Sequence, residues 1–290
     1  MIPHRFEYSK AKSVSDAIAL LERYPDSKIL AGGMSLIPVM KLRLASPKRL
    51  IDIGGLRNDL SYIRSDARSL SIGALTRHNE IITSDLVRSK APALVDAAEV
   101  IGDEQVRNMG TLGGSLTHAD PAADYAGVAI AMDAVVSVRG SRGTRTIPIS
   151  DFFVDTFTTK LSPTELMTEI NFPLKARNGA AYMKLERRAG DFATIGVASS
   201  IQVDSKGICE WAGIGLVSAG PTPIKARNAE RELVGNNIHS DSVIRKAAEA
   251  AASKDASPAG DLKGDEEYKR EMIKVFTERS LSRALDRTGA

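Results

Sequence analysis

The chain has 290 residues, of which 43% are hydrophobic and 26% are charged, a composition that is ordinary for a globular protein. Its 39 basic and 36 acidic side chains leave a formal net charge of +3, which argues against a broad basic surface for nucleic acid. The single cysteine, Cys209, excludes an internal disulfide and an iron–sulfur cluster held by this chain alone.

The N-terminus and the longest apolar run give no sign of membrane insertion. Residues 1–6 lack the apolar core of a signal peptide, and the apolar run 126–132 is broken by Asp133. We therefore expect a cytoplasmic protein, with attachment at the inner face of the membrane as an alternative.

The first 55 residues are predicted to form a small βαβ-type subdomain. Ser13 and Ser35 each precede a helical pattern and are expected to cap it. The expected elements are a helix over 13–23, a strand over 28–31, a helix from Ser35 to about Leu44 and a strand over 51–53. A glycine pair therefore lies between a strand and the start of a helix.

Residues 56–175 are expected to form a second subdomain, which contains antiparallel strands and several helices. Its expected elements are a hairpin of 60–64 with 70–73, helices capped by Thr76 and Ser84, a helix over 93–101, a glycine loop at 111–115, an alanine-rich helix over 122–132, a hairpin of 135–138 with 144–149, and a strand over 166–172. The polar, glycine-terminated segment 175–179 marks its end.

Residues 176–290 are expected to form a C-terminal domain with a three-stranded antiparallel sheet and helices. The strands are predicted at 181–186, 194–203 and 208–217, and the helices at 225–234, 242–252 and in a long final segment. Tyr268, Met272, Val275 and Phe276 form an apolar stripe on that last helix. The whole chain is thus an α+β protein.

Two glycine-rich stretches, residues 31–35 and 111–115, carry most of the functional information. Each sets bare backbone beside a small hydroxyl side chain, and such backbone lets N–H groups approach a phosphate. The simpler alternative is a pair of tight turns with Ser or Thr caps. Neither stretch matches G-x-G-x-x-G or G-x-x-x-x-G-K-[ST], which argues against Rossmann and P-loop sites. A diphosphate held from both sides is the functional interpretation.

Short polar side chains surround the second stretch, and they favour a ligand there. Asp124 is expected to accept hydrogen bonds from a ribose or ribityl hydroxyl, whereas Asp120 is expected to cap the following helix. His118 and Asp120 lack a third ligand nearby, so we predict no metal site. No nucleophile–base pair or acid–base carboxylate pair can be assembled, so no catalytic residue is predicted. This suits a chain whose chemistry is carried by a cofactor.

Four separated motifs resemble the FAD-binding medium subunit of the molybdenum hydroxylases, the family of xanthine dehydrogenase and aerobic carbon-monoxide dehydrogenase. The motifs are residues 28–36, 101–124, 170–173 and 182–193. They occur in the same order as in the family, and the resemblance covers essentially the whole chain. It implies a two-subdomain FAD-binding fold like that of the vanillyl-alcohol-oxidase (PCMH-type) class, with the C-terminal domain closing over an extended FAD.

The resemblance also implies which residues contact FAD. The two glycine stretches would hold the diphosphate, Ile101 would line the pocket, and Asp191 and Phe192 would lie by the isoalloxazine. The implied set is Lys28, Ala31, Gly32, Gly33, Met34, Ser35, Leu36, Ile101, Asn108, Thr111, Gly113, Gly114, Ser115, Asp124, Met167, Lys184, Asp191 and Phe192. The alternatives are an exposed ion pair of Lys184 with Glu186 or Asp191, and a core position for Phe192. Relatives that act on carbon monoxide commonly carry His in place of Met34.

The resemblance further implies a complex with two partner chains, expected as a dimer of heterotrimers. A large subunit would carry the molybdenum cofactor and oxidise the substrate, and a small subunit would carry two [2Fe–2S] clusters. The FAD of this chain would pass the electrons to a quinone, NAD or oxygen. Two alternatives remain, namely a self-contained flavin oxidoreductase and a non-enzymatic nucleotide-binding assembly module.

Overall fold

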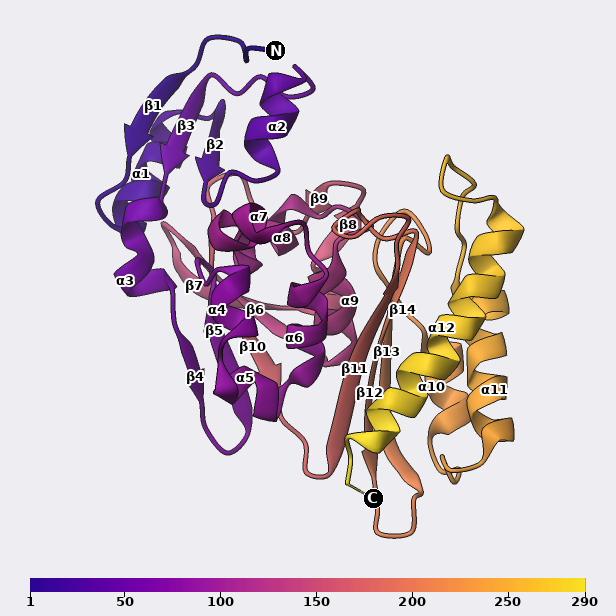
Figure 1. The fold of residues 1–290 in the computed structure, drawn as a ribbon. Helices are drawn as coiled ribbons and strands as arrows, with labels where there is room; N and C mark the ends of the chain where they lie inside the picture. The colour runs from indigo at the N-terminus through magenta and orange to yellow at the C-terminus, as the bar shows by residue number, and fades with distance from the viewer. Residues whose placement is uncertain (290) are drawn as a thin grey trace.

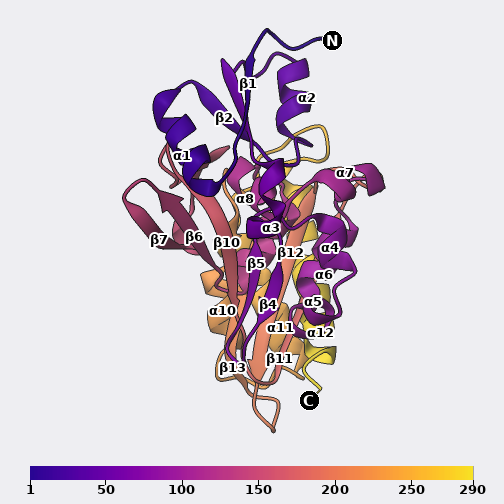
Figure 2. The same cartoon turned by 90° about the vertical axis from the view of Figure 1, so that its left-hand side faces the viewer.

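Three larger sheets with their helices follow one another along the chain in the computed structural model, which describes residues 1–289 (Figure 1). The first sheet is parallel, with the strand order β1-β3-β2. Its unit contains β1 (Glu7–Lys10), α1 (Val14–Arg23), β2 (Ser27–Leu30), α2 (Leu36–Lys41), β3 (Arg49–Asp52), η1 (Gly54–Leu56) and α3 (Arg57–Leu60). The predicted βαβ-type arrangement is confirmed. This unit stands at the end of the molecule opposite the C-terminus (Figure 2).

Both predicted serine caps lie at helix starts, but only one makes the capping bond. The Ser13 hydroxyl accepts a first-turn amide hydrogen of α1 at 3.0 Å. Ser35 precedes α2 without a capping bond, so the predicted cap is wrong in that respect. α2 also ends at Lys41, before the predicted Leu44, because Arg43 has a left-handed backbone (φ 62°) that an α-helix does not tolerate.

The second unit is built on a five-stranded sheet with the order β4-β5-β10-β6-β7, in which neighbouring strands are antiparallel. Its strands are β4 (Ile63–Ser65), β5 (Ser69–Gly73), β6 (Val135–Gly140), β7 (Gly143–Pro148) and β10 (Leu166–Pro173), beside a small hairpin of β8 (Phe153–Asp155) and β9 (Thr158–Thr159). Its helices are α4 (His78–Ile82), α5 (Asp85–Lys90), α6 (Pro92–Glu99), α7 (Glu104–Met109), α8 (Leu112–His118), α9 (Asp124–Ala131) and η2 (Ile149–Asp151). The two predicted hairpins and the strand that ends at Pro173 are confirmed.

The predicted caps in this unit are right at one helix and wrong at two. The Ser84 hydroxyl accepts the amide hydrogen of Val87 in α5. Arg77, not Thr76, precedes α4, because the Thr76 hydroxyl instead bonds the backbone of a neighbouring strand end. Asp120 accepts an amide hydrogen at 2.8 Å in the turn before α9, but Ala123 occupies the N-cap position.

The second glycine stretch is helical and is not the predicted loop. Gly113 and Gly114 form the first turn of α8, and the Thr111 hydroxyl caps that turn by accepting the Gly114 amide hydrogen at 3.1 Å. A Cβ on Gly113 would lie 2.6 Å from the Cβ of Ala74. Glycine is therefore required at position 113 by its close contact with Ala74, and not by a loop conformation.

The C-terminal unit is a four-stranded antiparallel sheet with helices on one face (Figure 1). It contains β11 (Asn178–Leu185), β12 (Ile195–Val203), β13 (Cys209–Val217), β14 (Ile224–Lys225), α10 (Arg227–Leu233), α11 (Asp241–Ala250), the π-helical η3 (Ala251–Asp255) and α12 (Glu266–Asp286). The three predicted strands are present. The fourth, β14, has only two residues, too few to show a periodicity. Within residues 1–289, no helix is both long and apolar enough to cross a bilayer.

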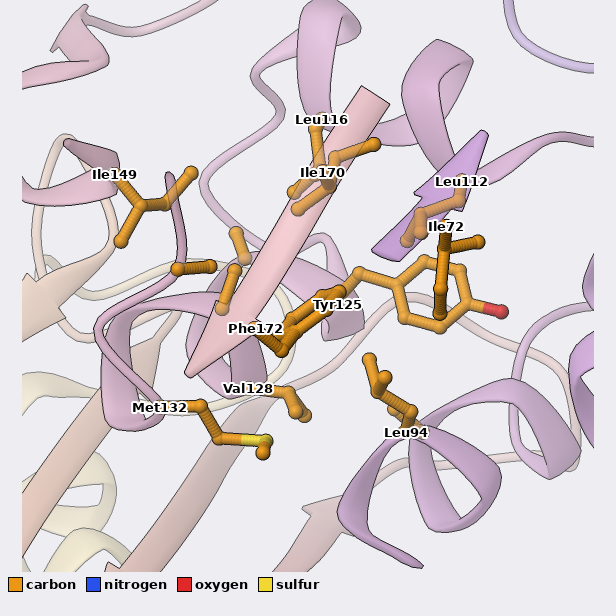
Figure 3. Close-up of a cluster of buried hydrophobic side chains, with 14 of the residues drawn as sticks. Ile72, Leu94, Leu112, Leu116, Tyr125, Val128, Met132, Ile149, Ile170 and Phe172 are labelled. Atoms are coloured by element: carbon orange, nitrogen blue, oxygen red, sulfur yellow. The ribbon is translucent and has the colours of Figure 1, made fainter. Parts of the chain in front are cut away.

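One hydrophobic core joins the second unit to the near face of the C-terminal sheet. Tyr125 of α9 lies at its centre among Ile72, Leu94 and Phe172 (Figure 3). Tyr182 of β11 belongs to the same core. The other face of that sheet packs against α10, α11 and α12 in a separate core. The domain limits at 1–55, 56–175 and 176–290 stay a prediction.

Candidate functional site

The first glycine stretch is an open turn between β2 and α2. Gly33 has a φ of +75°, a left-handed conformation in which a side chain would be strained. Within residues 1–289, the amide N–H groups of Gly32, Gly33, Met34 and Ser35 have no acceptor. Successive free amides in a turn form a concave site for an anion. The stretch therefore suits the diphosphate that the sequence pattern assigns to it.

The two glycine stretches, although distant in sequence, lie directly against each other. A Cβ on Gly32 would be 2.1 Å from the carbonyl oxygen of Met109, just before the second stretch. A Cβ on Gly114 would be 3.9 Å from the Cβ of Ala31. The parallel sheet of the first unit and α8 of the second unit thus present their glycines at one junction.

Four of the five amides of the second stretch donate hydrogen bonds within the protein. The N–H groups of residues 112 and 113 donate to the carbonyl oxygens of Thr76 and Ala74, and those of residues 114 and 115 donate to the hydroxyl and carbonyl of Thr111. The Thr111 N–H has no acceptor among residues 1–289, so the contact of this stretch with a diphosphate stays a prediction. The stretch also presents its small surface and the half-buried Ser115.

A buried charged cluster lies where α9 meets β11. The Asp124 carboxylate, whose residue is 5% exposed, accepts from the Tyr182 hydroxyl at 2.7 Å and from Lys184 Nζ at 3.4 Å. Lys184 Nζ also donates to the carbonyl oxygen of Val100 at 2.8 Å and lies 3.2 Å from Glu186 Oε2. The alternative is right about the ion pair with Glu186 but wrong about its exposure, because only 2% of the Lys184 side chain is exposed.

Burial controls the protonation of the Asp124 carboxylate. It raises the pKa of Asp124 from 3.8 to about 6, although Lys184 and the Tyr182 hydroxyl both favour the charged form. Both carboxylate oxygens have donors from the protein. Asp124 therefore holds the Lys184 ammonium group in place. The contact of Asp124 with cofactor hydroxyls stays a prediction.

The loop that carries Asp191 and Phe192 packs beside Ile101. Gly190 has a φ of +85°, and a Cβ there would lie 2.8 Å from the carbonyl oxygen of Gly102. Lys263 Nζ donates to the Phe192 carbonyl oxygen at 2.8 Å, while the Phe192 residue is 51% exposed. The alternative of a core position for Phe192 is therefore wrong. The Phe192 side chain is accessible, in the loop that follows β11.

The remaining predicted residues differ in their surroundings. Lys28 is exposed on β2, and Leu36 begins α2. Asn108 is exposed, and its side-chain oxygen accepts from Asn79 Nδ2 at 2.8 Å. Met167 is 2% exposed in the core of the second unit. The structure therefore brings the glycine stretches together, and Lys184 with Asp124, but gives Met167 a packing role.

Tyr182, Glu186 and Thr194 are polar residues in this region that the site prediction did not include. Tyr182 is 2% exposed and anchors Asp124 through its hydroxyl group. Alternation along β11, which places residues 182 and 184 on one face, was the signal available for Tyr182. No cluster of three potential metal ligands occurs in the described part of the chain, residues 1–289.

Comparison with known proteins decides the family. Residues 4–175 match the model of the FAD-binding domain in molybdopterin dehydrogenase, and residues 180–284 match the CO dehydrogenase flavoprotein C-terminal domain. This chain belongs to the FAD-binding medium subunits of the molybdenum hydroxylases. The resemblance seen in the sequence is confirmed, and so is the predicted fold class. The chain is an oxidoreductase subunit whose cofactor is FAD.

Individual relatives match over nearly their full length. The carbon monoxide dehydrogenase medium chain of Hydrogenophaga pseudoflava is 40% identical over 286 residues, which are 98% of each chain. The glyceraldehyde dehydrogenase medium chain of Sulfolobus acidocaldarius is 38% identical and covers 96% of this chain and 97% of its own. Among solved structures, a chain of the H. pseudoflava carbon monoxide dehydrogenase superposes with a TM-score of 0.95 at 42% identity and 99% coverage of both chains.

The residues present suit FAD. The four free amides of the first glycine stretch form a cradle for a diphosphate.

Proposed function

We propose that this chain carries FAD as the electron-transfer subunit of a molybdenum hydroxylase. It accepts electrons from iron–sulfur clusters of a small partner subunit, and it passes them to an external acceptor. The observation that carries the proposal is the amide cradle of Gly32 to Ser35, placed against Met109 in a chain that matches medium subunits from end to end. When bound, FAD supplies the ability to take up electrons singly and to deliver them in pairs.

This chain's own residues bind and orient the cofactor in this proposal. The amides of residues 32–35 hold the diphosphate, while Ala31 and Gly114 let the two units approach closely. Lys184 places a fixed positive charge beside the ring system, held by Asp124 and the Val100 carbonyl. Phe192 covers the ring on the side that the acceptor approaches. The remaining predicted contacts are part of this proposal.

The substrate is set by the large partner subunit and not by this chain. Relatives that are 38% to 40% identical to this chain are named as medium chains of carbon monoxide dehydrogenase and glyceraldehyde dehydrogenase and as subunit alpha of a 6-hydroxypseudooxynicotine dehydrogenase complex. Chains that are 38–40% identical to this one are therefore named for enzymes that act on different substrates. We propose a large molybdenum subunit and a small iron–sulfur subunit as partners, assembled as a dimer of heterotrimers. We place this complex in the cytoplasm, with attachment to the inner face of the membrane as the alternative.

Purification of the complex from its natural source tests the proposal. We expect about one FAD for each copy of this chain, bleached by the substrate of the large subunit and recovered on addition of an acceptor. Absence of FAD from the intact complex would refute the proposal and favour the assembly-module alternative. Turnover of an organic substrate by this chain alone would favour a self-contained oxidoreductase.

A further inference from the structure

Helix α2 is apolar nearly all the way round, but the chain covers only one side of it. Five of its six residues, Leu36–Lys41, are apolar, and Met40 is the only buried one. Ile37 is exposed near the start of the helix, and Leu42, directly after its last residue, is 52% exposed. A helix that is hydrophobic all round is normally buried. The outer side of α2 therefore has the composition of a surface that another molecule covers.

The N-terminal segment extends this apolar surface. In both views the N-terminus lies beside the end of α2 (Figure 1, Figure 2). Arg43 Nε donates to the carbonyl oxygen of Ile2 at 3.5 Å, which places the two segments in contact. Ile2 is 78% exposed and Leu44 is 76% exposed. Exposed apolar side chains that gather in one place mark an interaction site. Ile2, Ile37, Leu42 and Leu44 are here called the α2 patch.

The segments that form the α2 patch are rich in positive charge. Residues 27–51 contain five Lys or Arg and no Asp or Glu, and residues 1–6 contain no Asp or Glu either. Lys48 pairs with Asp26 at 2.6 Å, whereas Lys41 and Arg43 form no ion pair within residues 1–289. An apolar surface with unpaired cations at its edge is complementary to a partner surface with an apolar centre and an acidic rim.

Charge and size select one occupant for the α2 patch. In a symmetric contact between two copies the patch would face itself, so Lys41 and Arg43 would meet the same cations and repel them. Helices that lie in a bilayer surface often have about 20–30 residues, whereas α2 has six. A protein surface of opposite charge meets neither objection. Because α2 begins directly after the free amides of residues 32–35, this partner would lie beside the proposed cofactor cradle.

We propose that the α2 patch binds the small iron–sulfur subunit of the complex, through a face with an apolar centre and an acidic rim. The assignment rests on the proposed function, because it requires that subunit as a partner. In that function the iron–sulfur subunit delivers electrons to the FAD of this chain, and a contact along α2 brings it to the end of the molecule that holds the cradle. Leu42 and Leu44 supply the apolar contact, and Lys41 and Arg43 supply the charge.

A double variant, Leu42→Asp with Leu44→Asp, tests the apolar contact in the complex purified from the natural host through a tag on this chain. It places two unpaired charges in the contact, so we expect the affinity for the small subunit to fall at least about thirtyfold. The small subunit and its iron should then be lost from the purified complex. Val234→Asp, an exposed change after α10, is the matched control and should retain both. Equal amounts of small subunit in the double variant and the wild type would overturn the proposal.

Lys41→Glu tests the acidic rim of the partner. The reversed charge should weaken binding of the small subunit about tenfold at low salt and by less at high salt, because salt screens exposed charges. Lys41→Arg keeps the charge and should bind like the wild type. Lys246→Glu, an exposed change on α11, is the matched control. Affinity that is the same in Lys41→Glu and the wild type at every salt concentration would overturn the acidic rim.

The outcomes separate this inference from the proposed function. A wild-type chain that purifies with neither FAD nor an iron–sulfur subunit overturns the proposed function itself. A double variant that keeps the small subunit but no longer binds phosphatidylglycerol vesicles assigns the α2 patch to a membrane, and one that keeps it but no longer self-associates assigns the patch to a second copy. Either result overturns the inference and leaves the proposed function intact. If the double variant unfolds, Leu44→Ser repeats the test with an expected loss of affinity of about fivefold.

Discussion

The guanidinium group of Arg287 donates to the Asp96 carboxylate at 2.6 Å and so fastens the last helix to the FAD-binding part of the chain. The same carboxylate accepts from Arg283 and from the backbone amide of Tyr182, the residue whose hydroxyl holds Asp124. One buried carboxylate therefore connects α6, β11 and α12. Tyr182 links this carboxylate to the charged cluster, because its backbone amide bonds Asp96 and its hydroxyl bonds Asp124.

We expect Arg287→Ala to destabilise the protein more than Arg283→Ala. Arg287 is 25% exposed in its side chain and makes two hydrogen bonds to Asp96, whereas Arg283 is 48% exposed and makes one. Losing the less exposed partner of a buried carboxylate should cost about 2–3 kcal/mol, and losing the more exposed one about 1 kcal/mol or less. Urea denaturation of both variants measures the difference. Equal losses of unfolding free energy in the two variants would contradict the larger role given to Arg287.

Gly33→Asp should abolish FAD retention while the partner subunits keep their metals. The substitution strains the left-handed backbone at φ +75° and places a negative charge beside the free amides of the first glycine stretch. Gly235→Asp is the matched control, since Gly235 has a φ of +82° and no atom within 4 Å of an added Cβ. Absorbance of the purified complex at flavin wavelengths measures retention. Retained FAD in Gly33→Asp would remove this stretch from the site.

His78 should make the protein less stable in acid. Burial, followed by the nearby charge of Arg107, lowers the pKa of His78 from 6.5 to about 4. Between these two values the unfolded chain binds the proton and the folded chain does not, so stability falls as the pH drops from 6.5 to 4. The contribution reaches about 3 kcal/mol. Urea titrations of wild type and His78→Leu across this range should show a smaller pH slope in the variant.

Asp124 should produce the opposite slope. Its pKa is raised from 3.8 to about 6 by burial, so the folded chain retains a proton that the unfolded chain has lost in this window. Stability therefore falls as the pH rises from about 4 to 6, by about 3 kcal/mol at most. Asp124→Asn should remove this fall. An unchanged slope in that variant would show that Asp124 does not titrate as stated.

Tyr182→Phe should weaken the cluster without removing its charges. The buried Tyr182 hydroxyl donates to Asp124 at 2.7 Å and favours the ionised carboxylate. Its loss should cost about 1–2 kcal/mol and move the pKa of Asp124 upwards. The pH window over which stability falls should then extend above 6, which the same urea titrations measure. A window identical to wild type would contradict the role given to the hydroxyl.

The elements with strong local signals could be predicted from the sequence. The Ser13 cap, the β6–β7 hairpin and the strands β11 to β13 depend on nearest neighbours and on periodicity, which the chain displays directly. β14 and the early end of α2 could not be predicted. A two-residue strand has no periodicity, and arginine as a residue type gives no signal for the left-handed backbone of Arg43.

The candidate site also has a part that the sequence predicts and a part that only the structure reveals. The glycine stretches and Asp124 are recognisable as a pattern, but the pattern does not reveal which amides remain free. Thr76 and Ala74, distant in sequence, take two of the second stretch's amide hydrogens. The sequence left an exposed ion pair open as the alternative for Lys184, and the burial of its ammonium group against Val100 excludes that exposure. Hydrogen-bond occupancy and burial are therefore properties of the tertiary structure.

By itself, the sequence determined the order of the elements, the family and FAD as the cofactor, because these follow from local periodicity and from motifs that occur along one chain. Only the tertiary structure decided that the two glycine stretches meet, that the first keeps four amides free and the second one, and that Lys184 lies between two carboxylates. The physical reason is that a hydrogen bond or an ion pair needs both partners within a few ångströms. That proximity is created by packing three units together and is not recorded in the spacing of residues.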